Sequence, residues 1–139
     1  MAVAEGKKCT SVTGAYNVGA VLVDINENKV VSCGYSRELE GNTHAEQCAL
    51  EKYSLSDSAE YAMYTTMEPC STRLSGKQPC VQRIISHPAI KKLYYCVEEP
   101  LNFVDCNGLE LIAEAGIEIF NVDQLKREAE ALNSHLIKN

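Results

Sequence analysis

Residues 18–35 of this 139-residue chain read Val-Gly-Ala-Val-Leu-Val-Asp-Ile-Asn-Glu-Asn-Lys-Val-Val-Ser-Cys-Gly-Tyr. The nearly continuous apolar run at 18–24 is typical of a strand that is covered on both faces. Turn-forming residues at 26–28 lead into a second strand at 29–35. The segment therefore predicts a β-hairpin at the start of a sheet.

Helical and strand patterns alternate after this hairpin. Apolar residues at helical spacing predict a helix from Thr43, and residues 62–66 then predict a third strand, which leads into Glu68-Pro-Cys. The alternation continues with helices at 81–86 and 109–115 and with strands at 92–97 and 117–120. A hairpin followed by alternating helices and strands predicts an α/β domain with a mixed five-stranded sheet in a three-layer α/β/α arrangement.

The end of the chain has the clearest amphipathic pattern. Five apolar residues are spaced alternately three and four positions apart: Val122, Leu125, Ala129, Leu132 and Leu136. This spacing predicts one helix whose apolar side docks on the sheet or on a second subunit.

Composition and charge predict one globular domain over residues 1–139. The chain has a mass of 15.3 kDa, with 45% hydrophobic and 23% charged residues. No apolar run approaches the ~18 residues of a membrane span, and the N-terminus does not resemble a secretory signal.

The formal net charge of −6 disfavours nucleic acid as a partner. The odd number of cysteines, seven, predicts reduced thiols or metal ligands in a cytoplasmic protein rather than a disulfide framework.

Three short motifs could supply ligands to a metal ion: His44-Ala-Glu46, Pro69-Cys70 and Pro79-Cys80. Two thiolates and one imidazole predict a Zn²⁺ site that keeps its fourth position open, as catalytic zinc sites do. A position at a helix start is expected to lower the pKa of the Cys80 thiol. Cys48 is interpreted as a buried helix residue, and Cys33 and Cys96 as core residues, while Cys9 and Cys106 lie in poorly defined segments.

Glu46 admits two interpretations. Thr43 to Glu46 matches a capping box, in which Glu46 would only cap the helix that begins there. A cap does not explain the two Pro-Cys motifs, however, and all three motifs together favour a catalytic Glu46.

His-Ala-Glu followed by Pro-Cys and a further cysteine resembles the zinc-dependent cytidine-deaminase superfamily, whose usual signature is H-x-E with P-C-x-x-C. Here nine residues separate Cys70 from Cys80. This longer loop resembles the riboflavin-pathway branch, the diaminohydroxyphosphoribosylaminopyrimidine deaminases, and Arg-Leu-Ser-Gly at 73–76 resembles its stand-alone fungal form. The likeness covers roughly residues 17–120 and implies a cytidine-deaminase-like fold.

The resemblance implies hydrolytic deamination of 2,5-diamino-6-ribitylamino-4(3H)-pyrimidinone 5'-phosphate, or its ribosylamino form, to a 5-aminouracil product and ammonia. One Zn²⁺ per chain, held by His44, Cys70 and Cys80, would activate a water molecule. Glu46 would take a proton from this water and deliver protons to the ring nitrogen and to the leaving ammonia.

The charge pattern around the two Pro-Cys motifs favours a phosphorylated substrate. Residues 69–97 contain five Lys or Arg and no Asp or Glu, whereas the rest of the chain has eight basic and nineteen acidic residues, a charge of −11. The resemblance implies that Lys77 contacts the phosphate, with Arg73 as the second candidate because a guanidinium can bind phosphate bidentately. It also implies that Asn17 contacts the pyrimidine and Asn102 the sugar chain.

Other functions remain open. A cytidine or deoxycytidylate deaminase would have the short two-residue gap between its cysteines, and a non-catalytic zinc-binding partner subunit would need Glu46 only as a cap. The charge and the scarcity of aromatic residues disfavour a polynucleotide deaminase. The resemblance also implies a homo-oligomer, with a dimer favoured. We expect no reductase segment in this chain and no membrane partner.

Overall fold

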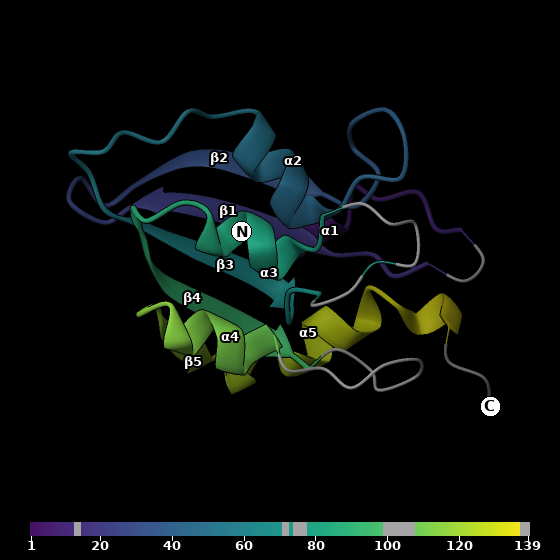
Figure 1. Ribbon diagram of the computed structural model, residues 1–139. Coiled ribbons are helices and arrows are strands. Elements are labelled where there is room, and N and C mark those ends of the chain that lie inside the picture. Colours follow the sequence, from purple (N-terminus) through teal and green to yellow (C-terminus); the bar gives the residue numbers. More distant parts are fainter. Residues whose placement is uncertain (13–14, 71–72, 74–77, 99–107, 137–139) are drawn as a thin grey trace.

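The computed structural model shows that the predicted hairpin forms one edge of a five-stranded sheet (Figure 1). Strands β1 (Gly19–Asp24) and β2 (Lys29–Tyr35) pair antiparallel. Asn28 in the turn between them has a φ of 52°, a left-handed conformation that asparagine tolerates well. The structure describes residues 1–12, 15–70, 73, 78–98 and 108–136.

The strands lie in the order β2-β1-β3-β4-β5, so the sheet is mixed, as predicted. β3 (Tyr61–Met67) pairs antiparallel with β1, whereas β3, β4 (Ile90–Val97) and β5 (Glu118–Asn121) run parallel to one another. Parallel neighbours require crossover connections. Helices α3 (Cys80–Ile85) and α4 (Gly108–Glu114) lie within these two crossovers.

Helices cover both faces of the sheet, as two close backbone approaches show. A Cβ atom on Gly19 would lie 1.9 Å from a backbone oxygen of α1 (Ala2–Gly6). A Cβ atom on Gly34 would lie 2.2 Å from a backbone oxygen of α2 (Ala45–Glu51). Gly34 pairs with Ala20, and successive strand residues point to opposite faces, so α1 and α2 lie on opposite sides. The three-layer α/β/α prediction is therefore confirmed.

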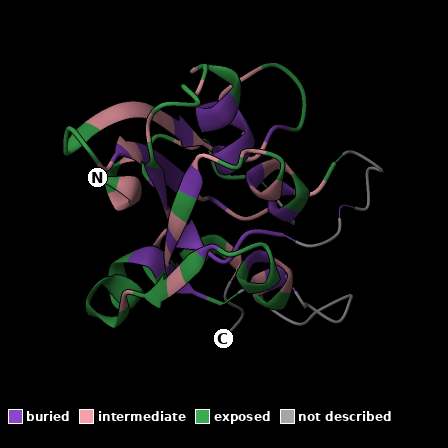
Figure 2. Cartoon of the chain, turned by 60° about the vertical axis from the view of Figure 1, so that its left-hand side comes forward, coloured by how far each residue is buried: buried purple, intermediate pink, exposed green. Residues whose placement is uncertain are grey.

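The main hydrophobic core lies between the sheet and the helices α2, α3 and α4. Buried residues gather along the strands and on the helices packed against them (Figure 2). Its largest fully buried members include Leu22, Met63, Ile84, Leu93 and Ile112. Burying one such side chain stabilises the fold by about 1.5–3 kcal/mol. A smaller cluster near the end of β4 contains Met67, Cys96, Val97 and Ala129.

The described helices are short, and the longest α-helices, α2 and α4, have seven residues each. Helices of this length are not stable in isolation, so packing against the sheet must supply most of their stability. Among the described residues, no helix has both the length and the apolar character needed to cross a membrane.

The C-terminal segment differs from the single amphipathic helix that the spacing predicted. It consists of a 3-10 turn, Asp123–Leu125, then α5, Lys126–Ala131, and a second 3-10 turn, Ser134–Leu136. The prediction is wrong at both ends because residues there bind distant parts of the chain. The Val122 N–H donates to the Tyr95 carbonyl and so extends the sheet, while Asn133 turns inward to bind the backbone of Asn17. Ala129 is buried, but Leu125 is 41% exposed.

Candidate metal centre

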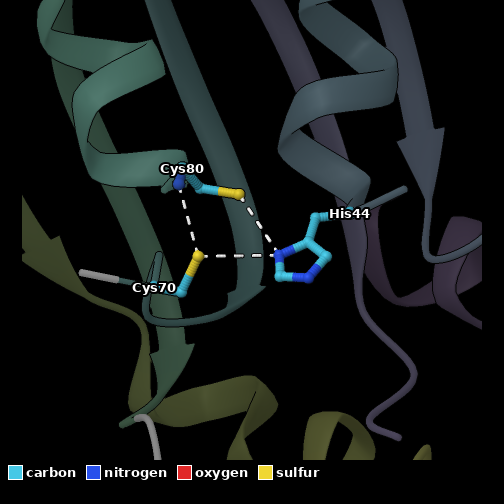
Figure 3. A group of neighbouring side chains, drawn as sticks. All are labelled: His44, Cys70 and Cys80. Carbon is cyan, nitrogen blue, oxygen red and sulfur yellow. Dashed lines mark hydrogen bonds between the residues drawn. The ribbon is translucent and has the colours of Figure 1, made fainter. Parts of the chain in front are cut away.

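His44, Cys70 and Cys80 come together from three separate elements (Figure 3). His44 is the N-cap residue of α2, Cys70 follows β3, and Cys80 is the first residue of α3. His44 Nδ1 lies 3.6 Å from the Cys70 Sγ and 3.5 Å from the Cys80 Sγ. The predicted convergence of these three residues is therefore confirmed.

The spacing of the three donor atoms fits a zinc ion. Zn–S bonds of about 2.3 Å and Zn–N bonds of about 2.0–2.1 Å in a tetrahedron separate a nitrogen ligand from a sulfur ligand by about 3.6 Å. Both nitrogen-to-sulfur distances at this site are close to that value. All three donor atoms lie within 4.8 Å of one another, and both cysteines are buried. Three protein ligands leave one tetrahedral position for water or substrate, as in catalytic zinc sites.

In the part of the chain that the structure describes, the other cysteines do not belong to this group. Cys48 is fully buried on α2, as predicted, and Cys96 is buried on β4. Cys33 on β2 and Cys9 are only half-buried, so the core assignment of Cys33 is wrong. Cys106 lies outside the described residues.

The two thiols differ strongly in their acidity. The hydrogen bond with the Cys80 thiol, together with those from His44 and from the Cys80 N–H at 3.3 Å, stabilises the Cys70 thiolate and lowers the pKa of Cys70 to about 4. The hydrogen bond with Cys70 and burial raise the pKa of Cys80 well above its ordinary value. The expectation of a lowered pKa at Cys80 is therefore wrong. Cys80 does begin α3, but its N–H points at the sulfur of Cys70.

This asymmetry predicts how many protons zinc binding releases. At about pH 7.5 the metal-free protein has Cys70 as thiolate and Cys80 as thiol, so zinc must displace about one proton, rather than the two expected of ordinary thiols. Isothermal titration calorimetry in buffers of different ionisation enthalpy measures this number directly. A release of about two protons per zinc would contradict the assignment of a thiolate to Cys70.

Glu46 lies beside the metal ligands and does not cap α2. The helix begins one residue later than the capping-box interpretation requires: His44 is the N-cap residue, and its N–H donates to Gln47 Oε1 at 3.4 Å. The Thr43 hydroxyl instead donates to the Leu39 carbonyl at 3.0 Å. Glu46 is 4% exposed, and its Oε1 accepts a hydrogen bond of 2.6 Å from the Thr65 hydroxyl. The capping-box interpretation of Thr43 and Glu46 is therefore wrong.

A cavity of about 230 Å³ is lined by His44, Cys70 and Glu46, whereas the third metal-site residue, Cys80, is fully buried and is not part of its wall. Its wall also contains residues that the sequence analysis did not single out, among them Tyr16, Ser36, Arg37, Asn42, Met67 and Glu68. Glu68 directly precedes Pro69-Cys70, so its position in that motif was a usable signal. Arg37 had no such signal. Arg37 reaches the cavity because it follows β2 in a turn, where its φ is 64°. Its guanidinium donates a hydrogen bond of 3.1 Å to the carbonyl of Tyr16, another residue of the cavity wall.

Two of the predicted substrate contacts are engaged by the protein itself. The Asn17 amide donates to the Ser11 hydroxyl and to the Leu132 carbonyl, both at 3.0 Å, and accepts a hydrogen bond from Arg37. The buried Arg73 guanidinium donates to Gln47 Oε1 at 3.0 Å and to a carbonyl of residue 42 at 2.6 Å. The other two predicted contacts, Lys77 and Asn102, lie outside the described residues.

The acid-free segment 69–97 does not fold into one cationic surface. Lys91 and Lys92 lie at the start of β4, whereas the metal site lies beyond the end of its parallel neighbour β3, at the opposite end of the sheet. Arg83 lies 3.6 Å from Glu51 at the far end of α2. The argument for a phosphate therefore depends on Arg73 and Lys77 and not on the whole segment.

Comparison with known proteins agrees with this site. Residues 1–97 match the family model of the cytidine and deoxycytidylate deaminase zinc-binding region. The chain is 47% identical, over 119 residues, to a diaminohydroxyphosphoribosylamino-pyrimidine deaminase of Schizosaccharomyces pombe, and 36% identical to the riboflavin biosynthesis protein RibD of Bacillus amyloliquefaciens. These matches cover 83% and 84% of this chain but only 29% of each relative, so the chain spans less than a third of their length.

Solved structures show the same fold. The Aspergillus oryzae Rib2 deaminase superimposes with a TM-score of 0.82 at 34% identity, covering 94% of this chain and 86% of that one. The same protein has been solved in complex with DARIPP, and that structure gives a TM-score of 0.80 with coverage of 94% and 85%. The family model, the fold and the position of the three metal-site residues agree, and the chain belongs to the family of zinc-binding cytidine and deoxycytidylate deaminase domains.

Proposed function

We propose that this protein is a zinc-dependent deaminase of riboflavin biosynthesis that hydrolyses the exocyclic amine from a diaminopyrimidinone 5'-phosphate. The observation that carries the proposal is the placement of Glu46 in one cavity wall with His44 and Cys70, two of the three residues whose donor atoms come together with that of Cys80. The long spacing between the two cysteines and the 47% identity to a fungal deaminase of this kind support the substrate class.

The chemistry assigns distinct roles to the residues of the site. His44, Cys70 and Cys80 would hold Zn²⁺, which when bound polarises a water molecule and stabilises negative charge. Glu46 accepts a proton as the water oxygen adds to the ring carbon at position 2. Glu46 gives this proton to the ring nitrogen, then takes the second proton from the added hydroxyl group and passes it to the departing amine, so that the C–N bond breaks and ammonia leaves.

The substrate contacts follow from the same proposal. Tyr16 and Met67 give the cavity wall an apolar part that suits a flat pyrimidine ring. We propose Lys77, and then Arg73, for the phosphate, with Asn17 near the ring and Asn102 near the sugar chain. To bind the substrate, the Asn17 side chain would have to give up one of its hydrogen bonds to the protein. The likeness of residues 73–76 to the fungal form favours the ribitylamino over the ribosylamino substrate.

A comparison of substrates tests the proposal. The zinc-loaded protein is expected to release ammonia from 2,5-diamino-6-ribitylamino-4(3H)-pyrimidinone 5'-phosphate with a kcat/KM at least about 100-fold above that for cytidine or deoxycytidylate, because a site built for one set of polar groups rejects substrates lacking them. Ammonia release is measured for the three compounds side by side. Equal turnover of cytidine would overturn the substrate assignment, and no turnover of any compound would favour a non-catalytic zinc protein.

The proposal also covers the cellular compartment, the type of substrate and the oligomeric state. The six described cysteines are unpaired, which supports a reducing compartment such as the cytoplasm. The net charge of −6 supports a small-molecule substrate rather than a nucleic acid. We also propose a homo-oligomer, with a dimer favoured, because the resemblance to the family implies one.

A further inference from the structure

Thr65 lies directly beneath Glu46. Alternate residues of β3 share one face of the sheet, so Thr65 points to the same side as Tyr61 and Met63, which pack in the core against α2 and α3. The Thr65 side chain is 1% exposed, and its hydroxyl oxygen lies 2.6 Å from Glu46 Oε1. The contact joins the central part of the sheet to the first turn of α2.

The geometry of this hydrogen bond makes it a firm anchor. It is short and is made to a carboxylate, and both partners are buried. Threonine is branched at Cβ, so its side chain has few rotamers on a strand. The same hydroxyl lies 3.0 Å from the Met67 carbonyl, so its single proton has a second acceptor within β3. Thr65 is thus fixed by the strand, whereas glutamate has three rotatable side-chain bonds.

We propose that Thr65 is a positioning residue for Glu46. Its hydroxyl holds Oε1, so the carboxylate is presented to the cavity through its other oxygen, Oε2. This inference rests on the proposed function, because it assigns Thr65 to the same reaction without placing it in contact with substrate. Misplacing a reacting group by about 1 Å can cost about 100-fold in rate, so an anchor of this kind has a measurable effect on kcat.

A matched residue separates this role from simple burial. Thr66 is the next residue of β3 and is also 1% exposed. Its hydroxyl oxygen accepts a hydrogen bond of 3.1 Å from the Gly19 N–H and not from any group of α2. Replacing either threonine by valine keeps the shape and removes one buried hydroxyl, but only the change at Thr65 removes the anchor of Glu46.

The experiment compares zinc-loaded Thr65→Val, Thr65→Ser and Thr66→Val proteins with the ribitylamino phosphate substrate. Thr65→Val is expected to lower kcat by about 10- to 100-fold with KM within about 3-fold of the wild-type value. Thr65→Ser restores the hydroxyl and is expected to recover kcat to within about 3-fold. Thr66→Val is expected to keep kcat within about 2-fold. If Thr65→Val does not fold, Thr65→Ala removes the same hydroxyl. A wild-type kcat in the Thr65 variant, or an equal loss in Thr66→Val, would overturn the inference.

A second measurement does not depend on activity. A double-mutant cycle of Thr65→Val and Glu46→Ala, followed by urea unfolding of the metal-free protein, reports whether the two side chains interact. The loss of stability from Thr65→Val is expected to be clearly smaller when Glu46 is already replaced. Additive losses would overturn the inference. A wild-type protein that releases no ammonia would overturn the proposed function along with it, whereas an active wild type with an unchanged Thr65→Val kcat would overturn only the positioning role.

Discussion

Replacing Glu46 by glutamine is expected to lower the kcat of ammonia release by about 10³- to 10⁴-fold while the protein still binds one zinc ion per chain. Glutamine has the size of glutamate, and its amide oxygen can still accept the hydrogen bond from the Thr65 hydroxyl. It cannot take up a proton, however, and the proposed reaction asks Glu46 to accept and deliver a proton twice. Steady-state kinetics with the ribitylamino phosphate and zinc analysis of the purified variant measure the two expectations.

Glu51 provides the matched control for this substitution. It lies on the same helix, α2, but its side chain is 45% exposed and faces Arg83 across 3.6 Å. Glu51→Gln removes one negative charge from α2 at a distance from the metal site, and it is expected to keep kcat within about 2-fold, because exposed ion pairs contribute little. Near-normal ammonia release by Glu46→Gln would show that Glu46 is not the proton carrier of this reaction.

The strands could be predicted from the sequence because each has a local pattern. The hairpin at residues 18–35 combines an apolar run, a polar turn and a second strand, and β2 has the predicted bounds. The helix α1 could not be found in this way, because its five residues are too few to show a helical period. The C-terminal helix was predicted too long for a different reason. Its interruption depends on Asn133 binding the backbone of Asn17, 116 residues away in the chain.

The metal ligands could also be predicted, because histidine and cysteine beside strand and helix ends form a pattern that zinc sites require. The orientation of Glu46 could not. One residue of helix turns a side chain by about 100°, so the choice between a cap and a catalytic group depended on where α2 begins. The pKa values of Cys70 and Cys80 likewise depend on which sulfur accepts the hydrogen bond from the first N–H of α3. No pattern in the sequence predicts which of the two sulfurs that is.

Charge along the sequence was a poor guide to charge around the cavity. Residues 69–97 contain no acidic residue, but this segment begins beyond the end of β3 and returns to the start of the parallel strand β4. Lys91 and Lys92, at the start of β4, therefore lie at the end of the sheet opposite the metal site. An acidic residue directly outside the segment, Glu68, is instead part of the cavity wall. A linear count therefore cannot replace the geometry of the crossover between β3 and β4.

Replacing Cys70 by alanine is expected to abolish stable zinc binding and, with it, ammonia release. Cys70 is the thiolate of the metal-free site, and its loss leaves two of the three described metal-site residues, His44 and Cys80, which is one protein ligand fewer than a catalytic zinc site has. Zinc content after dialysis is expected to fall to less than about a tenth of one ion per chain, and activity to background.

Cys48→Ala is the matched control, because Cys48 is also buried but lies outside the metal-site group. Removing its sulfur leaves a small cavity in the core beside α2 and is expected to cost about 1 kcal/mol of stability, while zinc content and kcat remain near wild type. The pair of variants thus separates the chemistry of a ligand from the packing of a thiol. If Cys70→Ala kept a full zinc ion per chain, the metal would have to be held by other residues, and the assignment of the site to His44, Cys70 and Cys80 would be wrong.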